Sequence, residues 1–190
     1  MRKPYAGRND HLKRLPKEFY LGNSYVHWTM TIQDRRIGWL SEPSHYQFRE
    51  MLTHTTFRYG LAIPLYCCMP DHMHFLMIGL YPTTDQLAAV KYFRNRMGLV
   101  LEKRGFEFQH QAYDHVLQDN EREQTAFENT GEYIARNPER AGLVPEDGFR
   151  EYPFTDCLLP GYPELHFQQT DFWERFWRTI AYIQKSREAN

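Results

Sequence analysis

The sequence predicts an α+β fold with a mostly antiparallel sheet packed with helices, and three observations indicate it. Runs of β-branched and aromatic residues alternate along the chain with segments of helical spacing. Their order is strand, helix, strand, strand, helix, strand, helix, and the two successive strands are joined by a short turn. The chain has 190 residues, 42% of them hydrophobic, which suits one domain with a substantial core.

The first half of the chain supplies three of the predicted strands and one helix. A strand is expected over 24–36, where SYVHWTMTIQDRR alternates until a polar turn. A helix over 41–60 begins with serine and proline signals and ends at a glycine. Strands over 61–69 and 70–80 are joined by a Pro-Asp turn and can form a hairpin, and Pro64 places the first of them at an edge or a bulge.

The second half begins with the most regular helical pattern, over 82–105, where apolar residues recur every three or four positions. Residues 106–118 are expected to be extended. A helix over 119–137 follows, with Asn120 as its cap and a glutamate three residues later. It must end before Pro138, because proline disfavours the helical conformation of the residue that precedes it.

The whole chain, 1–190, is expected to be a single domain with two appendages. Residues 1–20 form a basic arm, and residues 160–190 form a C-terminal extension with an amphipathic helix over 170–186. No stretch reaches the roughly 18 apolar residues that a membrane helix needs. Three cysteines make no disulfide framework, so the sequence predicts a reduced, cytoplasmic protein.

The charge distribution is uneven although the net charge is only −1. Residues 1–17 carry six Lys or Arg against one Asp, and residues 91–104 carry five against one Glu. A neutral total can therefore conceal a positive face that suits nucleic acid. A solvated mixture of charges is the alternative interpretation.

Two histidines lie inside the apolar run CCMPDHMHFLMIGL. Strand residues two apart share a face, so the Cβ atoms of His72 and His74 should lie roughly 6–7 Å apart, which suits one metal ion. Met73 and Phe75 point the other way and can be buried. Two hydrogen-bonded histidines without a metal are the alternative, and a metal site needs further ligands.

A second pattern follows in the helix over 119–137. Tyr133 and Asn137 are four residues apart and lie on one face of that helix. Alternatively, Tyr133 is a packed aromatic residue and Asn137 caps the helix end before Pro138. The two patterns support each other only if this helix packs across the histidine face.

Together, MPDHMHFL and the later EYIARNPERAGLV resemble the HUH single-tyrosine transposases, and above all their REP-associated tyrosine transposase branch. That family has His-hydrophobic-His on a strand, then a helix with Tyr-Ile-x-x-Asn-Pro and an Ala-Gly-Leu-Val-like segment. FQHQAYDHVLQD and EYPFTD also resemble family segments, so the similarity covers residues 22–160. The sequence departs from the family in its near-neutral charge and in Tyr152, where tryptophan is usual.

The resemblance implies a ferredoxin- or RRM-like HUH nuclease core and a role for each matched residue. His72 and His74 would hold Mg²⁺ or Mn²⁺, with Asn137 as a third ligand through its side-chain oxygen. Tyr133 would attack a phosphodiester of single-stranded DNA and form a 5′-phosphotyrosine. A second 3′-OH can reverse that step, which gives strand transfer without an energy source.

The resemblance also implies a partner, single-stranded or hairpin DNA of the REP type. The expected DNA-binding residues are Lys91, Arg94, Arg96 and His115. The cations would contact phosphates, and aromatic rings would stack on unpaired bases. For Tyr92 and Phe93, core packing is favoured over stacking. No membrane partner is expected, and the protein should act as a monomer or a homodimer.

Two other functions stay open at this point. The first is a catalytically inactive relative that binds hairpin DNA or RNA, although the joint presence of His72, His74, Tyr133 and Asn137 argues against it. The second is a cupin-like metal hydrolase built on His-x-His. That fold needs a further glutamate and histidine at barrel spacing, and the long predicted helices argue against it.

Overall fold

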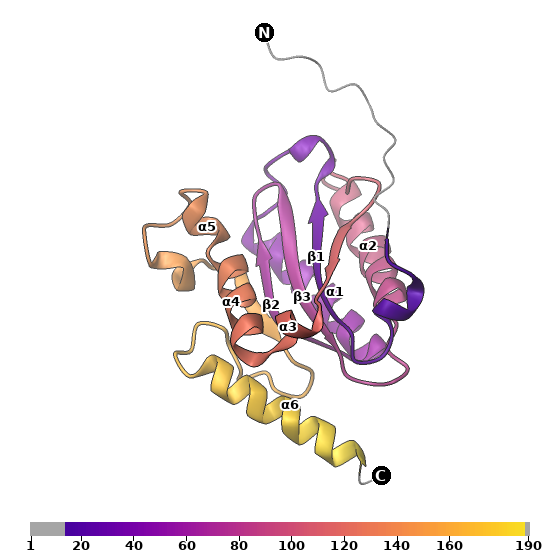
Figure 1. The fold of residues 1–190 in the computed structure, drawn as a ribbon. Helices are drawn as coiled ribbons and strands as arrows, with labels where there is room; N and C mark the ends of the chain where they lie inside the picture. Colours follow the sequence, from indigo (N-terminus) through magenta and orange to yellow (C-terminus); the bar gives the residue numbers. More distant parts are fainter. Residues whose placement is uncertain (1–13, 189–190) are drawn as a thin grey trace.

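A five-stranded sheet lies between two layers of helices in the computed structural model, which describes residues 14–188 (Figure 1). The strands are β1 (Tyr25–Thr31), β2 (Leu61–Cys68), β3 (His72–Gly79), β4 (Tyr113–Val116) and β5 (Thr155–Leu158). Their order across the sheet is β4-β1-β3-β2-β5. All four neighbouring pairs are antiparallel, which confirms the predicted α+β fold class.

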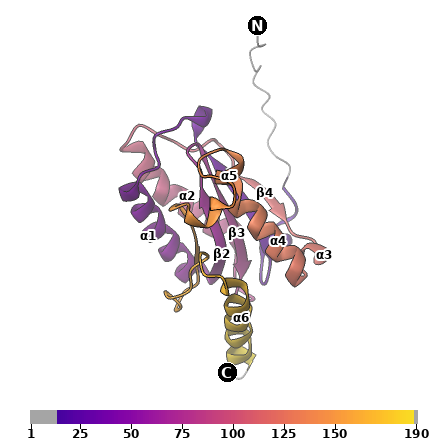
Figure 2. The same cartoon turned by 90° about the vertical axis from the view of Figure 1, so that its left-hand side faces the viewer.

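The helices divide between the two faces of this sheet. They are α1 (Glu42–Tyr59), α2 (Gln86–Glu102), α3 (Asp119–Arg122), α4 (Gln124–Ala135), α5 (Asn137–Arg140) and α6 (Phe172–Glu188). Helices α1 and α2 cover one face, while α4 and α6 lie on the other, as the two perpendicular views show (Figures 1 and 2). Three short 3₁₀ turns complete the fold: Lys17–Tyr20, Gln33–Arg35 and Gly148–Glu151.

Local sequence signals define the ends of α1 and α2. The Ser41 side chain accepts a hydrogen bond from the Ser44 backbone N–H at the start of α1. That helix ends at Gly60, whose φ of 62° is a left-handed conformation that glycine adopts without strain. Asp85 caps α2 by accepting a hydrogen bond from the Ala88 backbone N–H at 3.0 Å.

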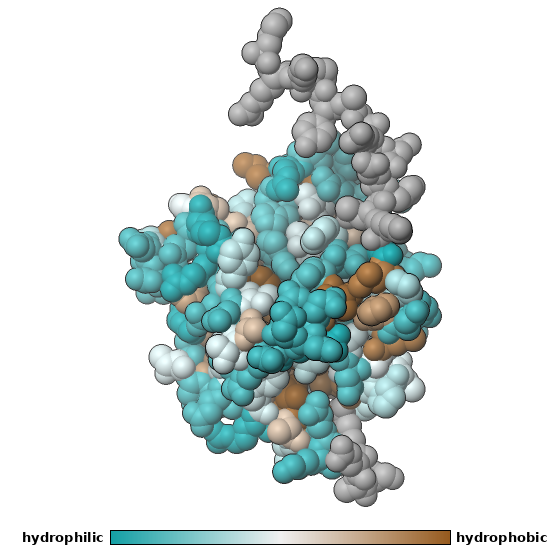
Figure 3. Space-filling model, viewed as in Figure 1, coloured by the Kyte–Doolittle hydropathy of each residue, from teal (hydrophilic) through white to brown (hydrophobic). Residues whose placement is uncertain are grey.

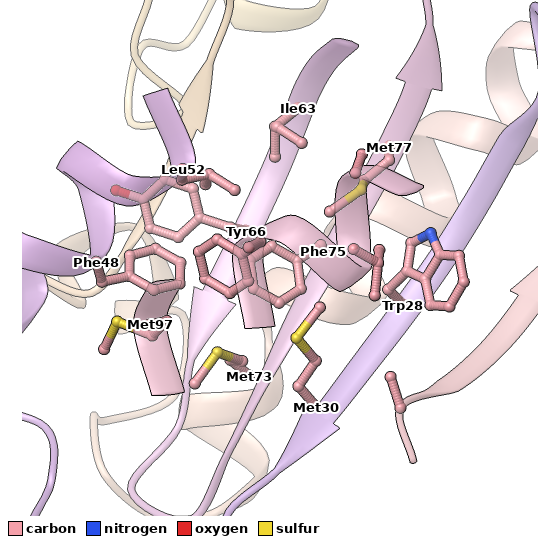
Figure 4. Close-up of a cluster of buried hydrophobic side chains, with 14 of the residues drawn as sticks. Trp28, Met30, Phe48, Leu52, Ile63, Tyr66, Met73, Phe75, Met77 and Met97 are labelled. Atoms are coloured by element: carbon pink, nitrogen blue, oxygen red, sulfur yellow. The ribbon is translucent and has the colours of Figure 1, made fainter. Parts of the chain in front are cut away.

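The face under α1 and α2 is a continuous apolar core (Figure 4). Phe75 of β3 lies between two helices, with its ring centroid 5.7 Å from Phe48 of α1 and 5.4 Å from Phe93 of α2. The other members labelled in Figure 4 are Trp28, Met30, Leu52, Ile63, Tyr66, Met73, Met77 and Met97, all fully buried. Aromatic and methionine side chains therefore fill this layer from both sides.

The opposite face is apolar only in part. Leu65 of β2 and Leu76 of β3 belong to a second buried cluster, which includes Phe127 of α4 and Phe176 of α6. The remaining half of this face carries histidine, threonine and tyrosine side chains that are only partly buried or are exposed. The molecular surface on this side is mainly hydrophilic (Figure 3).

Helix α6 packs against α4. Gly131 of α4 lies against the indole of Trp173, and a Cβ atom added at Gly131 would stand only 2.5 Å from the Cζ2 atom of that ring. The indole Nε1 of Trp177 donates a hydrogen bond of 2.8 Å to Glu128 of α4. The predicted C-terminal extension thus packs on α4 through an aromatic cluster.

The hairpin of β2 and β3 confirms the pairing that the Pro-Asp turn predicted. Of the two positions that Pro64 indicated, the bulge is right and the edge is wrong. The register of β2 shifts between Ala62 and Leu65 against β3, and β2 lies inside the sheet between β3 and β5. The bulge allows a residue without an N–H to sit in an interior strand.

The single helix expected over 119–137 is wrong, because the chain forms three helices there. Glu123, with extended backbone angles, separates α3 from α4. The capping box uses Gln118 and Glu121 rather than the expected pair at Asn120. Pro138 does not simply end a helix: it occupies the first turn of α5, where its missing N–H costs no hydrogen bond.

The N-terminal segment is partly folded onto the domain. Arg14 forms an ion pair with Asp114 at 3.0 Å, and the buried Tyr20 donates a hydrogen bond to the same carboxylate. Residues 14–20 therefore pack against the body, and residues 1–13 of the expected basic arm lie outside the described part. Within residues 14–188, no helix has the length and apolar character needed to cross a membrane.

Candidate active site

The polar half of the sheet face is built from three neighbouring strands. Thr29 of β1 pairs with His74 of β3 on one side and with Tyr113 of β4 on the other. His27 of β1 pairs in the same way with His115. Directly paired residues share a face and side chains alternate along each strand, so these five side chains lie on the same side of the sheet.

The two predicted ligands, His72 and His74, are brought together here. Their Nε2 atoms are 3.0 Å apart. The Nδ1 atom of His72 donates to Asp71 Oδ1 at 2.6 Å, and the Nδ1 atom of His74 lies 3.1 Å from both Thr29 Oγ1 and His27 Nε2. A neutral imidazole that donates from Nδ1 keeps its lone pair on Nε2, so both Nε2 atoms can face a common ligand.

Burial keeps the central imidazoles neutral. It lowers the pKa of His74 to about 3, and the nearby His27, His72 and Arg140 act in the same direction. Burial and the neighbouring His115 lower the pKa of His27 to about 4. Both rings are therefore uncharged near neutral pH, the state in which imidazole can bind a metal.

Two opposing effects act on the pKa of Asp71. Partial burial alone would raise its pKa, but hydrogen bonds from His72 and Arg35 lower it. Arg35 pairs with the second carboxylate oxygen at 2.9 Å. A charged carboxylate thus orients the His72 ring, which is the arrangement that commonly supports a metal-bound histidine.

These residues fit a divalent cation. Two nitrogen ligands at about 2.1 Å that meet a metal at a right angle lie about 3.0 Å apart, as do the two Nε2 atoms. Two facing lone pairs at that distance repel each other unless a proton or a cation lies between them. Among the described residues, no third His, Cys, Asp or Glu side chain joins this pair in a group that could hold a metal ion, so any further ligand must be of another type.

Tyr133 and Asn137 are connected to each other through a residue that sequence reasoning missed. Tyr133 is 65% exposed on α4, and the Arg140 guanidinium lies 4.0 Å from the centre of its ring. The same guanidinium donates a 2.8 Å hydrogen bond to Asn137 Oδ1. Asn137 Nδ2 donates to the Ile134 carbonyl at 2.8 Å, so its amide spans the break between α4 and α5.

Arg140 also relates this group to the histidines. Its charge contributes to the lowered pKa of His74 and also acts on the thiol of Cys67. Cys67 of β2 pairs directly with His74 of β3. The helix break therefore places the Arg140 charge where it affects the pKa of His74, while Asn137 Oδ1 accepts a hydrogen bond from Arg140. The assignment of Asn137 as a metal ligand stays a prediction.

The predicted basic residues of α2 lie on the other side of the sheet, because α2 packs in the core opposite the histidines. Lys91 and Arg96 are exposed. Arg94 is half-buried and donates hydrogen bonds to the carbonyls of Gln109 at 2.5 Å and His110 at 3.3 Å, so it fixes a loop before β4. Their contact with DNA stays a prediction.

The aromatic residues considered for base stacking also differ in their exposure. Phe93 is fully buried, so the core interpretation is confirmed for it. Tyr92 packs against Tyr59 at 5.7 Å. His115 is exposed on the histidine face, where its Nε2 atom lies 2.8 Å from Glu121.

Sequence reasoning missed His27, Asp71 and Arg140 as neighbours of the site. Asp71 had a usable signal, since it directly precedes His72 at the turn of the hairpin. His27 lies on the same face as Thr29 by simple alternation, but only the pairing of β1 with β3 brings it to His74. Arg140 required the break before α5.

Known proteins share this architecture. Residues 21–136 match the family model described as "Transposase IS200 like". A curated protein of Haemophilus influenzae, named as a REP-associated tyrosine transposase, is 25% identical over 167 residues, which cover 78% of this chain and 89% of that protein. A solved structure of a REP-associated tyrosine transposase bound to a REP hairpin has the same fold, with a TM-score of 0.62 and 15% identity over 75% of this chain and 82% of the other.

The family model covers 116 of the 190 residues and includes the histidine pair and Tyr133. The chain therefore belongs to the IS200-like transposase family, which confirms the family that its His-x-His and Tyr-Ile-x-x-Asn-Pro motifs predicted.

Proposed function

We propose that this protein cleaves single-stranded DNA at the foot of a hairpin-forming, REP-like repeat and joins the product to a new end. The observation that carries the proposal is the pair of facing Nε2 atoms of His72 and His74, 3.0 Å apart, with both Nδ1 atoms engaged. Family membership and the hairpin DNA in the related solved structure support the choice of substrate.

Tyr133 is the proposed nucleophile, and its exposure leaves the hydroxyl accessible to DNA. The tyrosine hydroxyl gives its proton to water as its oxygen forms a bond to phosphorus. The bond from phosphorus to the 3′ oxygen breaks, and the 3′ oxygen takes up a proton from water. The product is a 5′-phosphotyrosine with a free 3′-OH. Because one phosphodiester is exchanged for another, an incoming 3′-OH can reverse the step and join a new strand.

His72 and His74 are the proposed ligands of Mg²⁺ or Mn²⁺, with the Asn137 oxygen as a third. When bound, the cation would draw charge from the phosphate oxygens and favour attack at phosphorus. Asn137 Oδ1 accepts the hydrogen bond from Arg140 with one lone pair, and its second lone pair can serve a cation. The Arg140 guanidinium also lies beside the Tyr133 ring, where it can pair with the phosphate that the tyrosine attacks.

A second candidate function is hairpin binding without chemistry. The hydrogen bond between Arg140 and Asn137 favours it, because a guanidinium 2.8 Å from Asn137 Oδ1 repels a cation at the same oxygen. In that case the protein would bind hairpin DNA with Tyr133 unreacted.

Incubation with a labelled hairpin oligonucleotide and Mn²⁺ or Mg²⁺ tests the choice. We expect a covalent protein–DNA band on a denaturing gel, lost in excess chelator and absent in Tyr133→Phe. Tyr182→Phe is the matched control, since Tyr182 is similarly exposed on α6. Peptide mass spectrometry should find the nucleotide on the peptide that contains Tyr133. Binding without any adduct would instead favour the non-catalytic function, and a nucleotide on another peptide would move the nucleophile.

A further inference from the structure

We infer that Tyr113 and His115 of β4 form a stacking platform for the unpaired bases of the DNA that enters this site. The inference rests on the proposed function, and it assigns a role to a strand that the chemistry leaves unused. Tyr113 is 50% exposed. Among the described residues, its ring makes no aromatic contact, no cation contact and no side-chain hydrogen bond. An exposed aromatic ring without a partner on a sheet face can bind a planar ligand.

The position of the ring relates it to the histidine pair. Tyr113 is opposite Thr29, and Thr29 is opposite His74. Two strand spacings of about 4.7–4.9 Å separate the Cα positions of Tyr113 and His74, so roughly 9–10 Å lies between them. Strand side chains stand roughly perpendicular to the sheet, so the Tyr113 ring rises beside the histidines on the same face. A strand held by its phosphate at the histidines can therefore extend its neighbouring bases over β4.

The spacing along β4 matches stacked bases. Tyr113 and His115 are two residues apart, so they share a face and rise by about 6.7 Å. That rise is about twice the ~3.4 Å between stacked bases in a DNA strand. Glu121 holds the His115 ring at 2.8 Å, and the same carboxylate accepts the backbone N–H of Gln118 at the start of α3. The His115 ring is therefore positioned before any ligand arrives.

The chemistry of the surface favours bases over an apolar partner. The neighbouring side chains on this face are Thr29, His27 and His74, and each carries a polar group. The surface around them is mainly hydrophilic (Figure 3). Exposed aromatic residues on a four-stranded sheet are one established means of holding two or three unpaired bases. Stacking is tolerant of sequence, so the platform would position the single strand rather than read it.

Binding measurements in excess chelator test the platform without requiring cleavage. The probes are a hairpin with a single-stranded 5′ extension, the same hairpin with a 3′ extension, and the blunt hairpin. Tyr113→Thr keeps a residue with high strand propensity but removes the ring. We expect it to weaken binding of at least one extended hairpin roughly 5- to 150-fold, the range that loss of one stacked base implies. Binding of the blunt hairpin should be unchanged.

Two further variants separate stacking from a loss of folding. Tyr113→Phe keeps the ring and should bind as the parent does. Tyr46→Thr removes an aromatic residue that is 73% exposed on α1, on the other side of the sheet, and should have no effect. A 2-aminopurine base in the extension should be quenched by the parent and by Tyr113→Phe, but not by Tyr113→Thr. The salt dependence should stay the same, because the substitution removes no cation that pairs with a phosphate.

The outcomes distinguish the two proposals. If the parent binds the extended hairpins and Tyr113→Thr binds them equally well, the platform is wrong while the proposed function stands. An equal loss on extended and blunt hairpins would also overturn it, because the ring would then not act on unpaired bases. If the parent binds none of the hairpins, the proposed DNA substrate fails and the platform fails with it.

Discussion

His74 and Phe75 are consecutive residues of β3, and they belong to two very different environments. Phe75 points into the layer of α1 and α2, where aromatic rings contact it from both helices. His74 points to the opposite face, where its neighbours are Thr29, His27 and His72. Helices α1 and α2 bury one face in an apolar core, whereas α4 and α6 leave the histidine, threonine and tyrosine side chains of the other face partly exposed.

The comparison shows how one short strand can serve stability and chemistry at once. A sheet covered fully on both faces would have no room for a phosphodiester, and one open on both faces would bury too little apolar area to fold. Here the apolar burial is concentrated on one face. The polar side chains of the half-open site therefore lie outside the main apolar core, and their unfavourable burial does not disturb its packing. Substitutions on the open face should therefore reduce mainly activity, whereas substitutions on the covered face should reduce mainly the free energy of unfolding.

The largest effect is expected on activity at the open face. His74→Ala and His72→Ala should each remove the covalent DNA adduct to below detection, because each deletes one imidazole from the facing pair. The free energy of unfolding should change by only about 1–2 kcal/mol, the cost of the hydrogen bonds that these rings make. The adduct gel and urea unfolding measure the two quantities. Cleavage at the parent rate in excess chelator would show that the metal assignment is wrong.

On the covered face, Phe75→Ala should lower the free energy of unfolding by about 3–5 kcal/mol, because it leaves a cavity between α1 and α2. The molecules that remain folded should still form the adduct. The midpoint of urea unfolding measures the stability change. A loss below about 1 kcal/mol would mean that this face is packed far less tightly than the ring contacts indicate.

A smaller effect is expected one step away from the histidines. Asp71→Asn keeps an acceptor for His72 but removes its charge, and it should weaken Mn²⁺ binding by about 10- to 100-fold. Calorimetric titration of the protein without DNA measures this, and saturating Mn²⁺ should restore the adduct. Asp34→Asn, on the exposed turn after β1, is the control. Equal Mn²⁺ affinity in both variants would show that Asp71 does not support the metal site and only pairs with Arg35.

The smallest effects are expected on α2, away from the histidine face. Lys91→Ala and Arg96→Ala should each weaken binding to many DNA sequences alike and flatten the log–log salt dependence by about 0.9 for each phosphate that is no longer neutralised. Arg178→Ala, on the exposed surface of α6, is the control. If both slopes equal that of the parent, the charges of α2 are simply solvated. Arg94→Ala is a poorer test, because Arg94 also holds the loop before β4.

Local patterns were sufficient for the fold class and for the shared face of the histidines. Alternation alone places His72 and His74 together, because the side-chain period of a strand does not depend on the rest of the chain. His27 could not be assigned in this way, since its contact with His74 depends on the register between β1 and β3. Register is a property of the assembled sheet, and a single sequence does not state it.

The helix around Tyr133 shows the second limit. The sequence predicts one helix over 119–137, yet Glu123 and the Arg136–Asn137 step interrupt it. Proline can either end a helix or begin one, and the surrounding packing decides between these roles. Likewise, the basic residues of α2 are evident in the sequence, but which face of the sheet they occupy follows only from the topology.

The contacts of Trp173 and Trp177 with α4 also affect when α4 is stabilised during synthesis of the chain. The ribosome makes the chain from its N-terminus, so the sheet strands that carry the histidines and the helix that carries Tyr133 exist before α6. Helix α4 ends at Ala135 and α6 at Glu188. At about 5–20 residues per second, synthesis of the intervening chain takes roughly 3–10 s. During that interval Gly131 and Glu128 have no indole to contact. The tyrosine helix thus gains the support of α6 only after the strands and α4 have been synthesised.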